Sequence, residues 1–442
     1  MQNDKITLKD LSFFTSDGGS VFALLDHTTT HAGKEVLRKH IMQPPGTLDK
    51  LQQTQDAVKF WLEHGNYWPQ IISNGTLLML EKFFDAADYF SAPPSGITMM
   101  FSNLMLKLFN KNEYFFTQFS LSHLSDFLNG CKELMKVLEV QDIPPMLRSH
   151  LEEMQKELQH RLTEQIAAVN KQTPFKYLSK LSFSARREMK HTIQRLVQLY
   201  AKLDSWQAMA KAAHANKWTF PALLPEAPIA YEAKDLYHPL LAEPVSYDVN
   251  FGNGKNFLVL TGANMSGKTT FMRAMGVGAL LAHLGTGVPA ANMRISFLQG
   301  IITNMHVEDD LLKGESYFFA EVQRMKQTAQ RIIREGAHLV LMDELFKGTN
   351  VHDAYECTRA VIDGLLLQTG HIMVLSTHLY EVAQHFKDNP SLQFAYFVTN
   401  TTDDGNFKFR YQLKEGISND RIGYKILQRE GVIDLLQGKA GQ

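Results

Sequence analysis

The sequence predicts a mostly α-helical first half followed by a mixed α/β domain with a mainly parallel sheet. Up to about residue 230, apolar residues recur at steps of three and four, which is the period of an amphipathic helix. Beyond that point, short apolar runs alternate with helical segments, a pattern typical of parallel strands joined by crossover helices. We therefore expect two domains, residues 1–230 and 231–442.

Composition and charge argue against a strongly basic nucleic-acid-binding protein, a disulfide-rich protein and a membrane protein. The 442 residues have the composition of an ordinary soluble globular chain. With 45 basic and 46 acidic residues there is no basic field over the whole molecule, so a nucleic-acid partner would need a local patch. The two cysteines have no metal or disulfide spacing. A polar N-terminus and the lack of an apolar run of about 20 residues predict a cytoplasmic protein without membrane contact.

The first domain contains two apolar stripes, over residues 147–169 and 189–203. Their spacing predicts two long helices packed antiparallel, like a coiled-coil arm. Residues 171–184 lie between them, contain Pro174 and show little periodicity, so we expect them to form the tip of the arm.

The second domain has strand-like apolar runs at residues 257–260, 301–305, 339–342 and 372–375. Helices are expected after Gly267 and over residues 319–334. Such an alternation predicts a parallel sheet covered by helices on both faces. Residues 394–398 and 407–413, around a turn at Asp404 and Gly405, predict an added antiparallel hairpin.

A glycine-rich motif follows the first of these strands. Residues 262–269, Gly-Ala-Asn-Met-Ser-Gly-Lys-Thr, match the P-loop pattern G-x-x-x-x-G-K-[ST]. Glycines let backbone N–H groups surround phosphate oxygens, and the N-terminus of the next helix adds positive potential. Lys268 would neutralise the β- and γ-phosphates of ATP, and the Thr269 hydroxyl would ligate Mg²⁺. The predicted nucleotide contacts are Gly262, Ala263, Asn264, Met265, Ser266, Gly267, Lys268, Thr269 and Thr270.

Polar residues also end two other strands. Asp343 and Glu344 follow an apolar strand, where carboxylates are costly unless a cation meets them. Asp343 fits as the Mg²⁺ partner, and Glu344 as the base that polarises the attacking water. His378, after the strand at 372–375, is placed to contact the γ-phosphate or the water. The pattern predicts a Mg²⁺-dependent ATPase with Lys268, Glu344 and His378 as catalytic residues, although acids at a strand end also cap surface helices and a lone histidine can be structural.

These residues resemble the MutS family of DNA mismatch-repair ATPases, which are relatives of the ABC-type ATPases. Residues 261–270 are similar to the family's T-G-x-N-M-x-G-K-[ST]-T, and residues 309–318 to its signature loop D-D-x-x-x-G-x-S-T-F. Residues 343–349 and 377–378 are similar to its D-E-x-x-x-G-T and T-H motifs. In the first half, residues 25–33, 44–45 and 55–58 resemble the start of the MutS core domain.

The resemblance implies an α/β P-loop (ABC-type) ATPase domain behind a helical core and lever domain. It also implies a homodimer with C-terminal dimerisation helices, in which Ser316 of one subunit faces the γ-phosphate bound to the other. ATP and Mg²⁺ would be the cofactors. ATP binding would close the dimer and move the helical arms, in mismatch repair or related DNA maintenance.

The chain also departs from the family pattern. Core-like sequence starts almost at Met1 and residues 171–184 are too few for a clamp domain, so we expect a short form without the mismatch-recognition, connector and clamp domains. The resemblance therefore does not extend to direct mismatch reading. Val245 stands near the position of an adenine-stacking aromatic, a role open to Tyr247. Ala263 and Tyr317 replace the usual proline and threonine.

One cluster of charge suggests a nucleic-acid contact. Between residues 171 and 195 the cations are Lys171, Lys176, Lys180, Arg186, Arg187, Lys190 and Arg195, against the single acid Glu188. We hypothesise that Lys176, Lys180, Arg186, Arg187 and Lys190 touch the nucleic-acid backbone without reading sequence. A solvated helix surface explains the same pattern. Two other functions stay open: an ATP-gated scaffold that binds no DNA, and another ABC-type ATPase, against which the D-D-x-x-x-G-x-S segment argues.

Overall fold

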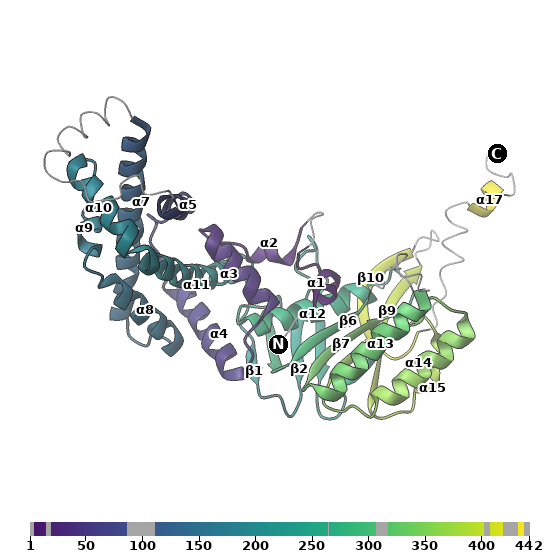
Figure 1. Cartoon of the computed structure of the whole chain (residues 1–442). Helices are drawn as coiled ribbons and strands as arrows, with labels where there is room; N and C mark the ends of the chain where they lie inside the picture. The colour runs from purple at the N-terminus through teal and green to yellow at the C-terminus, as the bar shows by residue number, and fades with distance from the viewer. Residues whose placement is uncertain are drawn as a thin grey trace. The chain divides into compact units, whose positions relative to one another are not determined.

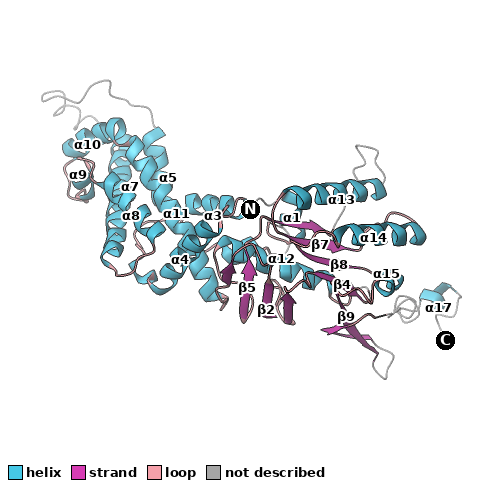
Figure 2. Cartoon of the chain, turned by 90° about the horizontal axis from the view of Figure 1, so that it is seen from below, coloured by secondary structure: helices cyan, strands magenta, loops and turns pink. Residues whose placement is uncertain are grey.

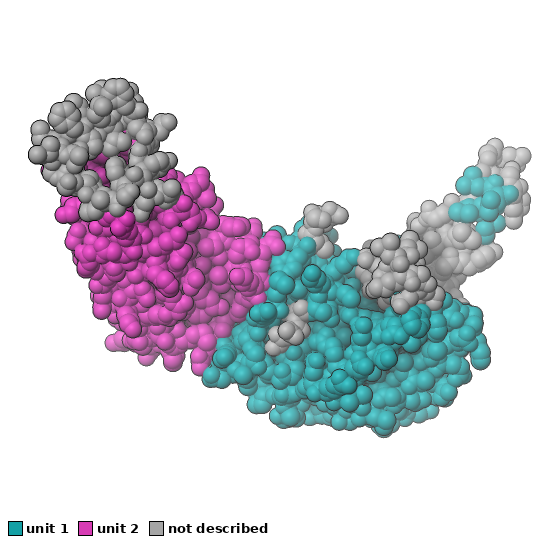
Figure 3. Space-filling model, in the orientation of Figure 1, with its two compact units in different colours: residues 1–24, 41–52, 215–442 teal, residues 25–40, 53–214 magenta. Residues whose placement is uncertain are grey.

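The computed structural model describes residues 4–14, 19–85, 111–263, 265–305, 317–401, 407–418 and 432–436. The chain divides into two compact units (Figure 3). The α/β unit comprises Met1–Leu24, Ile41–Gln52 and Ala215–Gln442, and the helical unit comprises Leu25–His40 and Gln53–His214. The first residues of the chain thus lie with the C-terminal half.

Helices account for nearly all regular structure before Ala215 (Figure 1). They are α1 Lys5–Asp10, α2 Val21–Leu25, α3 His31–Met42, α4 Leu48–Glu63, α5 Asn74–Asp85, α7 Lys111–Met135, α8 Pro145–Leu158, α9 Thr163–Ala167, α10 Phe175–Glu188 and α11 Lys190–Ala215. Two short 3-10 helices, η1 Gly65–Tyr67 and η2 Lys136–Glu139, join them. The predicted helical character of the first half is confirmed.

Helices α8 and α11 run antiparallel, as predicted. Arg195 of α11 pairs with Glu153 of α8, and a ring nitrogen of His150 lies 3.1 Å from the Leu199 carbonyl oxygen. Residue numbers therefore rise along one helix as they fall along the other.

The single helix expected over residues 147–169 is wrong beyond Leu158, where the chain turns and resumes as α9. Side chains of α7 bind the C-terminal end of α9. The hydroxyl of Ser125 and the amide of Asn129 donate to the Ala167 carbonyl, at 2.9 and 3.0 Å. Ile166 remains fully buried, so the apolar stripe serves two helices instead of one.

The expected absence of periodicity at residues 171–184 is also wrong, because most of this segment lies in α10. Pro174 is the N-cap of α10, a place where proline does not disturb helical hydrogen bonding. Leu178, Leu181 and Ala185 are buried at steps of three and four.

The described residues of the α/β unit form two sheets. Its strands are β1 Ala222–Leu224, β2 Tyr231–Leu236, β3 Tyr247–Phe251, β4 Phe257–Thr261, β5 Asn292–Ser296, β6 Gly300–Asn304, β7 His338–Asp343, β8 Ile372–Ser376, β9 Leu392–Thr401 and β10 Phe407–Glu415. Its later helices are α12 Lys268–Leu284, α13 Tyr317–Arg334, α14 Val351–Leu365, α15 Tyr380–His385 and α17 Val432–Leu436.

The larger sheet has the strand order β10-β9-β4-β8-β7-β6. Pairing is parallel from β9 through to β6 and antiparallel between β9 and β10. The parallel sheet and the antiparallel pairing of the added hairpin are therefore confirmed, whereas its expected turn at Asp404 and Gly405 lies outside the described residues. The second sheet, with the order β1-β5-β2-β3, was not expected, because its strands are short and lie far apart in the sequence.

Helices cover both faces of the larger sheet (Figure 2). On one face, α13, α14 and α15 share an apolar core with alternate strand residues such as Val259, Val340 and Leu375. On the other face, α12 contacts β6, β7 and β8 as well as β2 of the smaller sheet. Nearly every residue of α12 is buried, which fits a helix enclosed on several sides. Among the described residues, no helix is long and apolar enough to cross a membrane.

A buried carboxylate organises the helical unit. Asp204 of α11 accepts hydrogen bonds from the backbone N–H groups of Thr29 and Thr30, both at 2.9 Å, and from the Thr30 hydroxyl at 2.7 Å. A Cβ atom at Gly33 would collide with the Asp204 carboxylate, so only glycine allows α3 to approach α11 this closely. This contact gives the Thr-Thr-Thr-His-Ala-Gly segment a structural role.

Replacing Asp204 by alanine should lower the free energy of unfolding by about 3 kcal/mol, because two buried donors and one half-buried donor lose a charged acceptor. Urea denaturation followed by circular dichroism measures this loss. The matched control is Glu152→Ala on the exposed side of α8, which should change stability by less than about 0.5 kcal/mol. Equal stability of the two variants would contradict the role of Asp204.

Candidate functional site

The glycine-rich loop, residues 262–269, joins the buried strand β4 to α12. Gly262 and Gly267 have φ values of 129° and 110°, which side chains rarely tolerate, so glycine is required at both bends. Helix α12 begins at Lys268, directly after the second bend. The Lys268 side chain is only 5% exposed, and its ammonium group donates to the carbonyl oxygens of Gly262 (2.8 Å) and Ala263 (3.0 Å). The loop thus folds around its own lysine.

Asp343 ends strand β7 and faces this loop. The Thr269 hydroxyl donates to Asp343 Oδ2 at 2.6 Å, and the Ser376 hydroxyl donates to Asp343 Oδ1. Because β8 pairs with both β4 and β7, their carboxyl ends meet at one edge of the sheet. The polar ends of three parallel strands are therefore brought together, as the sequence predicts.

Glu344 has a constrained backbone and a crowded carboxylate. Its φ of 54° is unusual for a residue with a side chain, and its N–H donates to the Ser376 carbonyl at 3.0 Å. The carboxylate lies 3.7 Å from the Lys268 ammonium, 3.2 Å from that of Lys347 and 3.7 Å from His378 Nδ1. His378, followed by the two lysines, lowers the pKa of Glu344 to about 2 against the opposing effect of burial.

A cavity of about 610 Å³ opens over these groups. It is lined by Leu241, Glu243, Val245, Tyr247, Met265, Ser266, Gly267, Lys268, Thr269, Thr270, Met305, Asp343, Glu344, Lys347 and Tyr411. Burial lowers the pKa of Lys268, and the carboxylates of Glu344 and Asp343 partly offset that effect. The Ser266 hydroxyl is buried in the cavity wall and has no hydrogen-bond partner among the described residues. A ligand with hydrogen-bond acceptors would satisfy it.

Most of the predicted site residues lie in or beside this cavity. His378 is half exposed, and its Nδ1 lies 3.7 Å from the Glu344 carboxylate. Asn264 and Ser316 lie outside the described residues, as does nearly all of the signature segment 309–318. Tyr247 lines the cavity, but its ring packs edge-on against Phe271 and Phe397 and is 5% exposed.

Tyr411 is a cavity residue that the sequence did not indicate. A Cβ atom at Gly267 would lie 3.1 Å from the Tyr411 ring, so the ring sits directly beside the loop. Its position depends on an irregularity in the β9–β10 hairpin, where the register shifts between Phe409 and Leu413 and Tyr411 has a φ of 52°. A regular alternation along β10 would not identify it, and no motif marks the shift.

The predicted basic patch lies on and beside α10 in the helical unit. Lys176, Lys180 and Arg187 are exposed. Arg186 lies over the Phe83 ring at 4.7 Å, and the Lys190 ammonium lies 3.5 Å from Asp85. Arg186 and Lys190 of the patch therefore contact side chains of α5.

Two family models match the chain, one in each half. The family model for MutS domain III matches residues 6–215, and the model for MutS domain V matches residues 258–437. The chain is similar to the DNA mismatch repair protein MutS of Halalkalibacterium halodurans, with 26% identity over 56% of this chain and 29% of that protein. It is also similar to the DNA mismatch repair protein MutS of Bacillus pumilus, with 28% identity over 58% of this chain and 30% of that protein.

The aligned part thus spans about three tenths of the length of these relatives. Matches to two MutS domains, in the order helical unit and then α/β unit, account for most of the residues. The chain belongs to the MutS family.

Proposed function

We propose that the chain binds and hydrolyses ATP and associates with DNA as a homodimer, in mismatch repair or related DNA maintenance. The observation that carries the proposal is the convergence of Lys268, Thr269, Asp343 and Glu344 on one cavity. Membership of the MutS family supports this proposal and argues against another class of ABC-type ATPase.

Phosphate binding would use the loop and Lys268. The lysine ammonium now bonds two loop carbonyls, and phosphate oxygens would replace these as stronger, charged acceptors. Backbone N–H groups at the start of α12 and the Ser266 hydroxyl would add donors. The Tyr411 ring, beside the loop, offers an apolar face to the adenine base.

Thr269 and Asp343 fit a Mg²⁺ ion. They bring a hydroxyl and a carboxylate oxygen within 2.6 Å of each other, and Mg²⁺ prefers oxygen ligands. The described residues contain no group of three or more His, Cys, Asp or Glu side chains able to hold a metal ion. The two side chains would therefore hold the ion together with phosphate oxygens and water, and the ion would neutralise developing phosphate charge.

Glu344 is placed to orient the attacking water. Its low pKa keeps it ionised at neutral pH, so it accepts a hydrogen bond from water. Lys268 contributes to that low pKa, and ATP phosphates would compete for the same ammonium group. ATP binding would thus raise the basicity of Glu344 when a base is needed. His378, half exposed beside Glu344, would position the carboxylate or contact the γ-phosphate.

The dimer, the arm movement and DNA contact are the further parts of the proposal. Ser316 would complete the partner's site across the dimer, as in the family pattern. The exposed cations on α10 would contact nucleic-acid backbone. The engagement of Arg186 and Lys190 with α5 favours a second candidate, an ATP-gated scaffold without DNA binding.

Glu344→Ala should lower ATP turnover by at least about 10²-fold while leaving ATP binding intact, because the phosphate contacts remain. Turnover by the wild type and the variant is measured without DNA and with homoduplex, mismatched and branched DNA. Glu356→Gln, which removes a surface carboxylate paired with Arg359, serves as the control and should match the wild type. Stimulation by any DNA supports the leading function, and indifference to all of them favours the scaffold. Turnover unchanged by Glu344→Ala would contradict the catalytic assignment.

Thr269→Val should raise the Mg²⁺ concentration for half-maximal turnover by about tenfold, because the variant keeps the shape of the side chain but lacks the oxygen ligand. A Mg²⁺ titration at fixed ATP measures the shift. ATP binding in the presence of a chelator should be the same in both proteins, which separates metal binding from phosphate binding. An unshifted Mg²⁺ curve would exclude Thr269 as a ligand.

Lys176→Glu combined with Lys180→Glu should weaken DNA retention and reduce the slope of log affinity against log salt by about 2, one for each phosphate contact. Fluorescence anisotropy with labelled duplex at several salt concentrations measures both. Lys136→Glu combined with Lys156→Glu makes the same change of net charge elsewhere in the helical unit. Equal DNA retention by the two double variants would exclude Lys176 and Lys180 as DNA contacts.

A further inference from the structure

A polar stripe runs along the face of α13 that packs on the sheet. Its members are Glu321, Arg324, Thr328 and Arg331, at helical steps of three and four. The apolar residues Met325 and Ile332 of the same helix enter the core beside it. Glu321 is 7% exposed and Thr328 is 1% exposed. Buried polar side chains need hydrogen-bond partners. Those of this stripe reach partners in two directions, one toward the loop after Glu344 and one toward β6.

The first direction is toward the loop that follows Glu344. The Glu321 carboxylate accepts hydrogen bonds from the backbone N–H groups of Lys347 and Gly348, both at 3.2 Å. A Cβ atom at Gly348 would lie 2.7 Å from the backbone nitrogen of Phe318, so the loop touches the start of α13. Within this loop Glu344 and Phe346 have positive φ values, 54° and 61°. Such a backbone persists only where its surroundings hold it.

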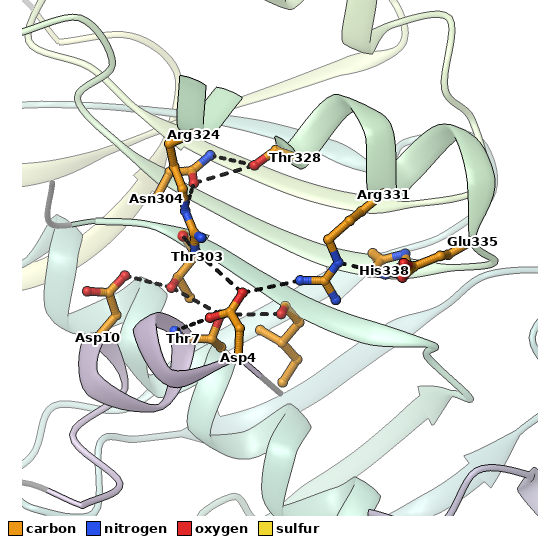
Figure 4. Close-up of polar contacts among 11 residues, drawn as sticks. Asp4, Thr7, Asp10, Thr303, Asn304, Arg324, Thr328, Arg331, Glu335 and His338 are labelled. Carbon is orange, nitrogen blue, oxygen red and sulfur yellow. Dashed lines mark hydrogen bonds and ion pairs between the residues drawn. The ribbon is translucent and has the colours of Figure 1, made fainter. Parts of the chain in front are cut away.

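The second direction is toward β6. The Arg324 guanidinium donates to Asn304 Oδ1 at 2.9 Å and to the Thr303 carbonyl oxygen at 2.8 Å. The Asn304 amide donates to the Thr328 hydroxyl at 3.1 Å (Figure 4). Helix α13 is therefore attached at two points to the carboxyl end of β6.

Helix α1 joins this network through two acids (Figure 4). The Asp4 carboxylate lies 3.6 Å from Arg324 and 3.3 Å from Arg331. Asp10 is 1% exposed and accepts hydrogen bonds from the Thr303 hydroxyl at 2.6 Å and from the Met305 N–H at 3.4 Å. The N-terminal helix thus contacts both β6 and α13, although about 300 residues separate them in the sequence.

We propose that Glu321 is a positioning residue for Glu344 and Lys347, and that α1 acts on the same loop through Arg324 and Arg331 of α13. The proposal rests on the ATPase function proposed above. By fixing the backbone of the loop, Glu321 keeps the Glu344 carboxylate over the cavity. By fixing α13, Asp4 keeps Glu321 in place.

Glu321→Gln tests the loop contact. The variant has the same shape, but it keeps one acceptor oxygen and turns an amide NH₂ toward a backbone donor. The kcat for ATP should fall about tenfold, while the affinity for a fluorescent ADP analogue should stay within about twofold, because the phosphate loop is untouched. Gln327→Ala, on an exposed position of α13, should match the wild type. A wild-type kcat in Glu321→Gln, or an equal loss of ADP affinity, overturns the proposal.

Asp4→Asn tests the contact with α1. Asp4 also caps α1 by accepting a hydrogen bond from the Thr7 N–H at 2.6 Å, and asparagine caps helices equally well. The variant therefore removes the charge beside Arg324 and Arg331 but preserves the helix. We expect kcat to fall about threefold, and we expect no further fall when Asp4→Asn is added to Glu321→Gln. Multiplicative effects on kcat would show that α1 does not act through Glu321. Lys5→Gln is the control on α1.

Amide hydrogen exchange keeps this test separate from the proposed function, because it needs no turnover. Glu321→Gln should speed exchange of the Lys347 and Gly348 amides at least about tenfold and leave the amides of β7 protected. If the wild type hydrolyses no ATP, the proposed function fails and exchange alone decides the positioning role. Unchanged exchange at both amides overturns that role.

Discussion

A buried ammonium group beside two carboxylates is the constraint on which the α/β unit depends. Lys268, Asp343 and Glu344 have side chains that are little exposed, and a charge in such a place is costly unless an opposite charge and hydrogen bonds surround it. Lys268 begins α12 after the loop that follows β4, whereas Asp343 ends β7 and Glu344 follows it. Strand β8, between β4 and β7, contributes Ser376. A shift in the register of any of these strands would leave a charge unpaired. The strand order of the larger sheet and the pairing of charges at the site therefore depend on each other.

The same physical rule extends away from the cavity. Asp10 and Glu321 are buried carboxylates, and each accepts hydrogen bonds from backbone N–H groups or hydroxyls of another element or loop. Asp204 does the same in the helical unit, where it holds the chain before α3. Each carboxylate fixes two segments relative to each other, because hydrogen bonds are directional and apolar contacts are not. Where such a contact ends at the loop carrying Glu344, structural order becomes relevant to the proposed catalysis.

Much of the site was predictable because it lies at strand ends. Apolar runs located β4, β7 and β8, and the parallel topology then required Lys268, Asp343 and His378 to share one edge. Tertiary contacts without a local pattern were not predictable. The end of α9 is bound by Ser125 and Asn129 of another helix, and the placement of Tyr411 depends on an irregular register. The network of Asp4 and Asp10 joins the first residues of the chain to residues about 300 positions later, so neither spacing nor composition indicates it.

Calorimetric titration of the full chain with ATP and Mg²⁺ tests directly whether the cavity over Lys268 binds ATP. We expect saturable binding at one site per chain, and at least about 10²-fold weaker binding by Lys268→Ala, since the ammonium group that meets the phosphates is lost. Circular dichroism checks that the variant is folded. Equal affinity of the folded variant and the wild type, or no binding by the wild type, would exclude this cavity as an ATP site that uses Lys268.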